Sequence, residues 1–211
     1  MFSNTITTGE GGTIFISVPT GTLQLQDDGT IQSGAANLGD AGNIFLNVAE
    51  MALDNTAITT KSAQSAGGNI DIQLSENFQL INSKITTKAQ GDEKRDHGGN
   101  ITINSPDFLI LDKSQLTTTG FVGDGGNIRI AAEHFIQSGD SMLDASSTLG
   151  VNGEISIDAS VEDFLALDLL SSQFGQSQLQ IQPCTTLLSQ KSKFTLGTRR
   201  GLSASPDDLQ P

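Results

Sequence analysis

The sequence predicts an all-β protein: a right-handed, three-faced parallel β-helix (solenoid) of about six coils with a C-terminal tail. The first observation is a motif of two small residues, most often followed by asparagine, that precedes an isoleucine six times. Consecutive motif isoleucines lie 26 to 31 residues apart, and a repeat of this length is typical of a solenoid. These isoleucines are Ile14, Ile44, Ile70, Ile101, Ile128 and Ile155.

The second observation is that apolar residues form three short groups within each repeat. The first group is the motif isoleucine and the apolar residue two positions later, a spacing that puts both side chains on one face of a strand. The second group follows at Leu23/Leu25, Met51/Leu53, Phe78/Leu80, Phe108/Ile110 and Phe135. The third group, often followed by threonine, begins at Ile31, Ile58, Ile85, Leu116 and Leu143.

Three such short strands cannot bury an apolar face alone, but coils stacked on one another form three parallel sheets around one interior. Coils about 4.8 Å apart would give a rod of about 30 Å. The connections of parallel strands are almost always right-handed, which predicts the winding of the chain. An antiparallel sandwich or barrel is the alternative, but those folds have less regular strand patterns.

Asparagines recur at the same point of consecutive turns, directly before the motif isoleucine. We expect them to stack as a structural ladder with amide-to-amide hydrogen bonds, and both asparagine and glycine tolerate the left-handed backbone of tight turns. A row of amides that binds a ligand is the functional alternative. The ladder residues are Asn43, Asn69, Asn100 and Asn127.

One charged insertion, residues 89–97, precedes the fourth motif (Ala-Gln-Gly-Asp-Glu-Lys-Arg-Asp-His). Insertions in solenoid repeats lie in loops on one side of the rod, and loops carry many binding residues. The loop is therefore the first place to look for a contact with a ligand, although mixed charge also serves simple solvation.

The composition excludes several classes of function. A net charge of −13 argues against binding nucleic acid or anionic lipid, which attract lysine and arginine. The chain has no tyrosine or tryptophan, which disfavours an ordinary carbohydrate-binding cleft, and no apolar stretch long enough to span a membrane. Cys184 is the only cysteine, so an internal disulfide is impossible, while an intermolecular disulfide or a free thiol remains open.

Acidic residues recur in the turns before the motifs, at Asp40, Asp96 and Asp124. Aligned carboxylates could bind calcium together with backbone oxygens. The chain lacks the Gly-Gly-x-Gly-x-Asp repeat of calcium-binding β-rolls, so we expect these aspartates to cap turns. We predict no metal site and no cofactor.

The two histidines, His97 and His134, have no spacing that indicates a zinc site or a catalytic triad. Lys113 and Arg129 are the only basic residues between the charged loop and the tail, and they do not cluster as a lyase base would require. We therefore predict surface histidines, no catalytic residues and no enzymatic activity.

Two phenylalanines, Phe15 and Phe45, lie between the inward residues of the first two motif strands and should point outward on neighbouring coils. The same outward column continues with Asp71, Thr102, Arg129 and Ser156. We expect a loop or a neighbouring chain to cover the two rings.

The repeated Gly-Gly-Asn-Ile coils and the tail together resemble the filamentous-haemagglutinin-like exoproteins of two-partner secretion systems, of the cyanobacterial type. The tail of that family has a cysteine, a Ser-x-Phe-x-x-x-Gly-Arg-Gly-Gly-Leu-like stretch and an end that contains proline. Here these are Cys184, residues 192–202 (Ser-Lys-Phe-Thr-Leu-Gly-Thr-Arg-Arg-Gly-Leu) and residues 205–208 (Ser-Pro-Asp-Asp). Residues 198–201 (Thr-Arg-Arg-Gly) depart slightly from that stretch, with Arg200 where a glycine is usual.

The resemblance implies a secreted or cell-surface protein, exported through an outer-membrane transporter that recognises an amino-terminal secretion domain. Neither that domain nor a signal peptide is recognisable in this sequence. Residues 6–8 (Ile-Thr-Thr) match the third group, so we expect the chain to begin in the middle of a coil, as the carboxy-terminal piece of a longer rod. We expect β-helix repeats over 1–183 and a tail over 184–211 that is a candidate cap for the last coil.

The expected function is that of a non-catalytic structural or adhesive segment, an adhesin that contacts a host or neighbouring cell surface or the extracellular matrix. Two alternatives belong to other classes. One is a carbohydrate-active β-helix enzyme of the polysaccharide lyase or hydrolase type, which requires carboxylates and a basic residue gathered on one face. The other is a calcium-binding β-rod, which calcium titration during thermal melting would reveal.

Overall fold

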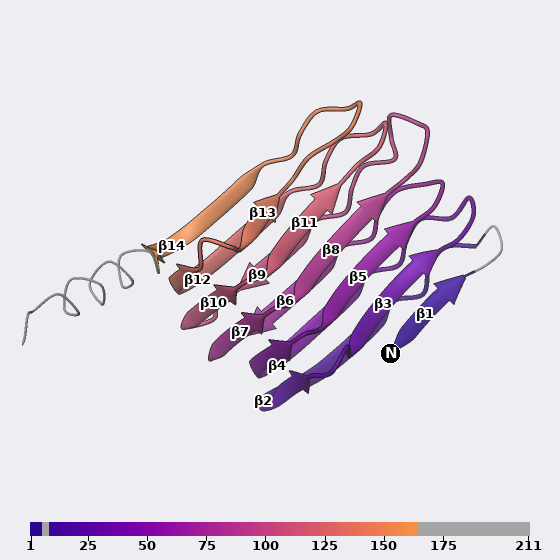
Figure 1. Cartoon of the computed structure of the whole chain (residues 1–211). Coiled ribbons are helices and arrows are strands. Elements are labelled where there is room, and N and C mark those ends of the chain that lie inside the picture. Colours follow the sequence, from indigo (N-terminus) through magenta and orange to yellow (C-terminus); the bar gives the residue numbers. More distant parts are fainter. Residues whose placement is uncertain (6–8, 164–211) are drawn as a thin grey trace, which may run out of the picture. The chain divides into compact units, whose positions relative to one another are not determined.

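The computed structural model describes residues 1–5 and 9–163, all of which belong to one compact unit, Met1–Ser172. Every element in this part of the chain is a β-strand, and all the strand pairs are parallel (Figure 1). Among the described residues there is no helix with the length and apolar character of a membrane span. The predicted tail, 184–211, and with it Cys184, lies outside the described residues.

The strands fall into two sheets. The strands that open at a motif isoleucine are β2 (Ile14–Leu25), β4 (Ile44–Asp54), β6 (Ile70–Leu74), β9 (Ile101–Asn104), β12 (Ile128–Gln137) and β14 (Ile155–Asp163). They share a sheet with β7 (Asn77–Ile81) and β10 (Phe108–Asp112). The second sheet, here called the third face, contains β1 (Phe2–Thr5), β3 (Thr30–Ala35), β5 (Ala57–Ser62), β8 (Lys84–Ala89), β11 (Gln115–Thr119) and β13 (Met142–Asp144).

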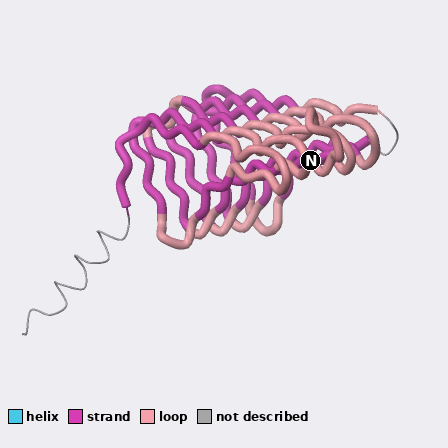
Figure 2. The backbone as a smooth tube through the Cα atoms, turned by 90° about the horizontal axis from the view of Figure 1, so that it is seen from above, coloured by secondary structure: helices cyan, strands magenta, loops and turns pink. Residues whose placement is uncertain are grey.

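The six motif isoleucines form one column, each paired with the next one along the stack, from Ile14 to Ile155. The fold is therefore the predicted parallel β-helix, and Figure 2 shows its coils lying one on another. The six isoleucines bound five complete turns, close to the predicted number of six. The sixth turn begins in β14, with which the described part of the chain ends.

The first two predicted strands of a repeat are separate only in the two central coils, as β6 with β7 and β9 with β10. In β2, β4, β12 and β14 the two predicted strands are one continuous strand. The pairing of β2 with β4 shifts register between Val18 and Thr22, and that of β12 with β14 shifts between Ala131 and His134. Between β9 and β10, Ser105 has a positive φ of 67° and precedes Pro106, which lacks a backbone N–H. This sequence ends the strand, whereas β2 and β12 cross the same corner with a shift of register.

The interior is apolar and tightly closed in the central coils. Ile101, Phe78 and Leu116, one from each face, are each fully buried. Full burial of such a side chain contributes about 1.5–3 kcal/mol, so the stack of columns supplies the main stabilisation of the fold. The third-group residues Ile31, Ile58, Ile85, Leu116 and Leu143 align in one column, as predicted.

One core prediction is wrong: Phe108 and Ile110 are not the inward residues of β10. Leu109 pairs with the buried Phe78, and Leu111 is fully buried as well, whereas Phe108 is 42% exposed. The strand contains four consecutive apolar residues, so the sequence lacks the apolar–polar alternation that would show which side chains point inward. Only pairing with β7 and β12 selects which two point inward.

The second glycine of each motif marks the closest approach of neighbouring coils. A Cβ added to Gly99 would lie 1.9 Å from the carbonyl oxygen of Gly68, and one added to Gly126 would lie 1.9 Å from that of Gly99. No side chain fits at such a distance, which explains why the motif contains glycine at this point in consecutive repeats.

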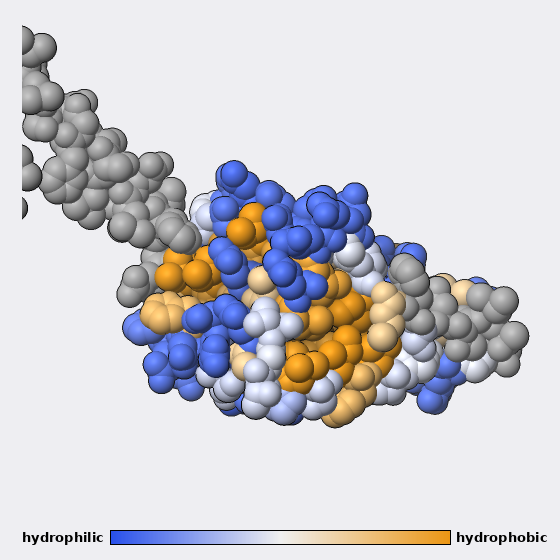
Figure 3. Space-filling model, turned by 90° about the horizontal axis from the view of Figure 1, so that it is seen from below, coloured by the Kyte–Doolittle hydropathy of each residue, from blue (hydrophilic) through white to orange (hydrophobic). Residues whose placement is uncertain are grey.

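The first described coil has an open side. The only strand that pairs with β2 among the described residues is β4, and the inward Ile16, Leu23 and Leu25 are only partly buried. Viewed from the side on which β2 lies in Figure 1, apolar residues form a surface framed by polar ones (Figure 3). This end therefore presents an unpaired strand edge next to apolar surface.

Residues 6–8, which the sequence matched to the third group, lie outside the described part of the chain. β1, which precedes them, pairs with β3 on the third face. The Gln32 N–H donates to the Met1 carbonyl at 2.9 Å, which places Met1 beside the third-group position of the next coil.

Candidate functional site

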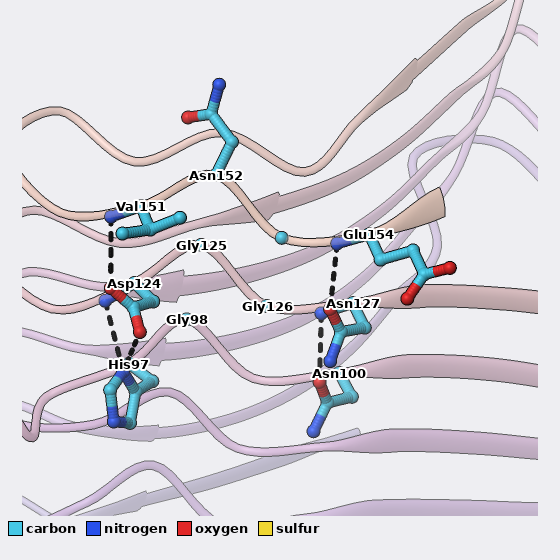
Figure 4. A pocket seen from close by; sticks show the side chains of 11 residues that line it. His97, Gly98, Asn100, Asp124, Gly125, Gly126, Asn127, Val151, Asn152 and Glu154 are labelled. Carbon is cyan, nitrogen blue, oxygen red and sulfur yellow. Dashed lines mark hydrogen bonds and ion pairs between the residues drawn. The ribbon is translucent and has the colours of Figure 1, made fainter. Parts of the chain in front are cut away.

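A depression of about 420 Å³ runs along the glycine turns at the end of the third face (Figure 4). It crosses three consecutive coils, and its floor is backbone of the motif glycines Gly98, Gly125, Gly126 and Gly153. Two rows of side chains stand on either side of this floor. The lining residues are His97, Gly98, Asn100, Asp124, Gly125, Gly126, Asn127, Val151, Asn152, Gly153 and Glu154.

The first row is the asparagine ladder. The backbone N–H of each residue donates to the Oδ1 of the asparagine one coil before: Asn69 to Asn43 at 2.8 Å, Asn100 to Asn69 at 2.9 Å, and Asn127 to Asn100 at 2.9 Å. Glu154 N–H donates to Asn127 Oδ1 at 2.8 Å. Asn100 Nδ2 also donates to Asn69 Oδ1 at 3.1 Å, the amide-to-amide bond among the four described ladder residues, so the ladder is chiefly side chain to backbone.

The second row lies at the other side of the floor and follows the same rule. The Asp124 N–H donates to His97 Nδ1 at 3.0 Å, and the Val151 N–H donates to Asp124 Oδ1 at 3.0 Å. Two coils earlier, the Ala66 N–H donates to Asp40 Oδ1 at 3.1 Å. The histidine thus replaces a carboxylate as the acceptor, which requires that Nδ1 carries no proton. In this tautomer the 3.6 Å approach of Nδ1 to Asp124 Oδ2 is not an ion pair.

Asp40 and Asp124 accept backbone N–H groups at the same point of their turns, whereas in the charged loop His97 holds that position and Asp96 caps the loop itself. Asp96 is instead buried, at 4% exposure, and its carboxylate accepts from the Glu93 N–H at 3.0 Å. The charged loop is therefore folded around its own carboxylate. Among the described residues, no three histidine, cysteine, aspartate or glutamate side chains gather as a metal site requires.

A ladder that the sequence did not reveal lies inside the third face. The hydroxyls of Thr60, Thr87 and Thr118 donate to the carbonyls of Gly68, Gly99 and Gly126 at 2.7, 2.6 and 2.5 Å. Ser33 makes the corresponding bond to Gly12 at 2.5 Å. These hydroxyls are fully buried and tie the third face to the glycine turns. The signal in the sequence was the second threonine of each Ile-Thr-Thr or Leu-Thr-Thr group.

A further ladder lies at the corner before the third face. The N–H of Thr56 donates to Ser83 Oγ at 3.1 Å, that of Ser83 to Ser114 Oγ at 3.1 Å, and that of Ser114 to Ser141 Oγ at 3.1 Å. Next to it, a column of residues with a positive φ runs through four coils: Asp28, Asn55, Asn82 and Lys113, with Asp27 beside the first of them. Aspartate and asparagine tolerate this left-handed conformation better than lysine.

His134, the other candidate histidine, lies outside the groove, on β12. Its ring stacks on Phe108 with 4.7 Å between centroids, and its Nδ1 lies 2.9 Å from Ser160 Oγ. The Ser160 hydroxyl also lies 2.8 Å from the Glu133 carbonyl, to which it can donate. The serine and histidine form a contact between coils on an open sheet surface.

Phe15 and Phe45 point outward on paired strands, as predicted, with exposures of 70% and 36%. Asp71 follows in the same column. Partial burial raises the pKa of the Asp71 carboxyl above its usual value of 3.8, and a hydrogen bond from Thr102 partly offsets that effect.

Comparison of the chain with protein-family models, with curated proteins and with solved structures finds no match.

Proposed function

We propose that this chain is a structural and adhesive segment of a secreted or cell-surface rod of the filamentous-haemagglutinin type, exported in its full-length form by a two-partner secretion system. In this proposal the rod contacts a host or neighbouring cell surface or the extracellular matrix. The full-length protein passes through an outer-membrane transporter, as the resemblance of the coils and of the tail implies.

The observation that carries the proposal is how the polar groups along the groove are used. The Oδ1 atoms of Asn43, Asn69, Asn100 and Asn127 each accept a backbone N–H of the next coil. His97 and Asp124 do the same in the second row. Groups that accept bonds from their own backbone have less capacity left for a substrate, which supports a structural role for the groove.

The inward polar groups support the same conclusion. No buried side-chain nitrogen or oxygen among the described residues lacks a hydrogen-bond partner. The buried hydroxyls tie the third face to the glycine turns, and the serine ladder joins each coil to the next. Such a design extends by adding coils, which suits a protein whose task is to span a distance.

The proposal is tested by coating beads with the purified chain and counting the cells or matrix-coated surfaces that retain them. Adhesion that soluble chain competes away is the expected result. The matched control is Ile101→Asp, which places a charge in the fully buried isoleucine column and should abolish adhesion through unfolding.

A second measurement addresses catalysis. The chain is incubated with a panel of polysaccharides, and new reducing or unsaturated ends are counted. Turnover of any polysaccharide, or beads that do not adhere, would contradict the proposal. A gene for an outer-membrane transporter next to this one would support the secretion route.

A further inference from the structure

The outward surface of the third face differs in charge from the rest of the molecule. On β3, β5, β8 and β11 the outward residues are threonine, glutamine, lysine, Gly34 and Ala57, and none is acidic. The acidic residue of this sheet is Asp144 on β13, at the border of the surface, where it pairs with Thr117 of β11. Residues 1–163 contain seven lysines and arginines against 21 aspartates and glutamates. Three of those seven basic residues, Lys61, Lys84 and Lys88, lie on this one surface.

The three lysines are exposed, and the structure gives their ammonium groups no hydrogen bond or ion pair with any described residue. Lys61 and Lys88 are direct neighbours on paired strands about 4.8 Å apart. Like charges in that position repel, which costs stability unless an anion lies between or above them. This repulsion indicates a place for a bound anion.

The surface between the lysines carries hydroxyls. Thr59, Thr86 and Thr117 form one column across β5, β8 and β11, which lie side by side in Figure 1. Lys84 and Lys88 stand on either side of Thr86 on one strand, roughly 13 Å apart for four residues of extended chain. An extended ligand can therefore meet charge, hydroxyl and charge in succession along β8.

The chemistry of the surface selects among anionic partners. Single-stranded nucleic acid requires aromatic side chains for stacking, and the outward positions of these four strands have none. Anionic membranes attract clusters of about four to eight basic residues, more than the three found here. Lysine binds a carboxylate as a point charge, without the paired geometry of arginine, and threonine hydroxyls suit the hydroxyls of a sugar.

We propose that the outward surface of β5, β8 and β11 binds an extended polyuronate, a polysaccharide whose sugar units carry carboxylates. The carboxylates lie at Lys61, Lys84 and Lys88, and the sugar hydroxyls pair with Thr59, Thr86 and Thr117. Recognition uses charge and hydroxyls instead of ring stacking, so it needs no tryptophan or tyrosine. This inference rests on the adhesive function proposed above and names a ligand for it.

The test is an isothermal titration calorimetry experiment, in which size-fractionated polygalacturonate is added to the whole chain at low salt. Replacing the three lysines together (K61Q/K84Q/K88Q) should weaken binding by at least about tenfold. The matched control, K94Q/R95Q/K113Q, removes three positive charges elsewhere and should change the affinity by less than about twofold. T86V/T117V should weaken binding while leaving the net charge unchanged.

Each further arm supports or overturns the proposal. Neutral dextran, polyglutamate, dextran sulfate, duplex DNA and anionic vesicles should all bind more weakly than polygalacturonate. Equal binding of polyglutamate would show that charge alone suffices and would overturn the assignment to a sugar. Equal losses in the two triple variants, or no binding by the unaltered chain, would overturn the proposed surface. Bead adhesion that persists in K61Q/K84Q/K88Q would leave the adhesive function intact and refute only this ligand.

Discussion

Thr86 and Thr87 are adjacent in β8, yet their surroundings are opposite. Thr87 is fully buried and its hydroxyl donates to the Gly99 carbonyl, whereas Thr86 lies on the outward surface between two lysines. The inward column continues as serine or threonine through four coils, while the outward column of Thr86 runs from Gln32 to Asp144. Stacking fixes what points inward, and the outward side is free to vary and to bind.

The largest effect is expected from a charge in an inward column. Ile101→Asp should lower the free energy of unfolding by more than about 4 kcal/mol, because an unpaired carboxylate would replace a fully buried isoleucine. Gln79→Asp, at an exposed outward position of β7, should change it by about 0.5 kcal/mol or less. Urea denaturation followed by circular dichroism measures both. Equal stabilities would contradict the assignment of the core.

A smaller loss is expected where two coils come closest. Gly99→Ala places a Cβ 1.9 Å from the Gly68 carbonyl oxygen, so the coils must separate, at a cost of about 2–3 kcal/mol. Gly29→Ala is the control, because its Cβ would meet no atom closer than 3.0 Å. Thermal melting of the two variants should show a marked drop only for the first. A drop of the same size in both would refute the account of the glycine motif.

Thr86 and Thr87 give a direct test of the difference between the outward and the inward side of β8. Thr87→Val removes a buried hydroxyl and leaves the Gly99 carbonyl without that donor, which should cost about 1–3 kcal/mol. Thr86→Val makes the same chemical change on the outward side and should cost no more than about 0.5 kcal/mol. Denaturation midpoints in urea compare them. A larger loss for Thr86→Val would reverse the assigned orientation of β8.

A gain is expected at the corner before the third face. Lys113 has a φ of 49° in a column otherwise occupied by Asp28, Asn55 and Asn82. Lys113→Asn should raise the free energy of unfolding by about 0.5–1 kcal/mol, because asparagine tolerates the left-handed conformation. The reciprocal change Asn82→Lys should lower it by a similar amount. Chemical denaturation in which both substitutions change the free energy of unfolding in the same direction would contradict this explanation.

The smallest effect concerns Asp71 and depends on pH. Its pKa is raised in the folded state, so at neutral pH the ionised carboxylate lowers stability, and this cost disappears once the pH falls below its ordinary value of 3.8. Asp71→Asn should therefore stabilise the protein at pH 7 by less than about 1 kcal/mol, since the carboxylate is still partly solvated. The difference between variant and unaltered chain, measured by melting from pH 7 downward, should shrink. A stability difference between the two proteins that grows on acidification would contradict a raised pKa of Asp71.

The sequence by itself determined the fold class and the inward columns that begin at the motifs. Ile14 to Ile155 and the third-group residues align as the repeat predicted, because a period of 26 to 31 residues with alternating apolar positions has one efficient way to bury them. The same repeat marked the asparagine ladder, since the amide recurs at one point of each turn.

Tertiary structure alone decided the remaining features, because each depends on which atoms of neighbouring coils face each other. Which residues of β10 point inward depends on its pairing with β7, since Phe108 to Leu111 are all apolar. His97, and not Asp96, accepts the Asp124 N–H, because the loop folds around the buried Asp96 carboxylate. The lysine surface exists only because parallel pairing brings Lys61, from one repeat, beside Lys88, from the next. Local sequence fixes the spacing within a coil, whereas the register between coils is a property of the stack.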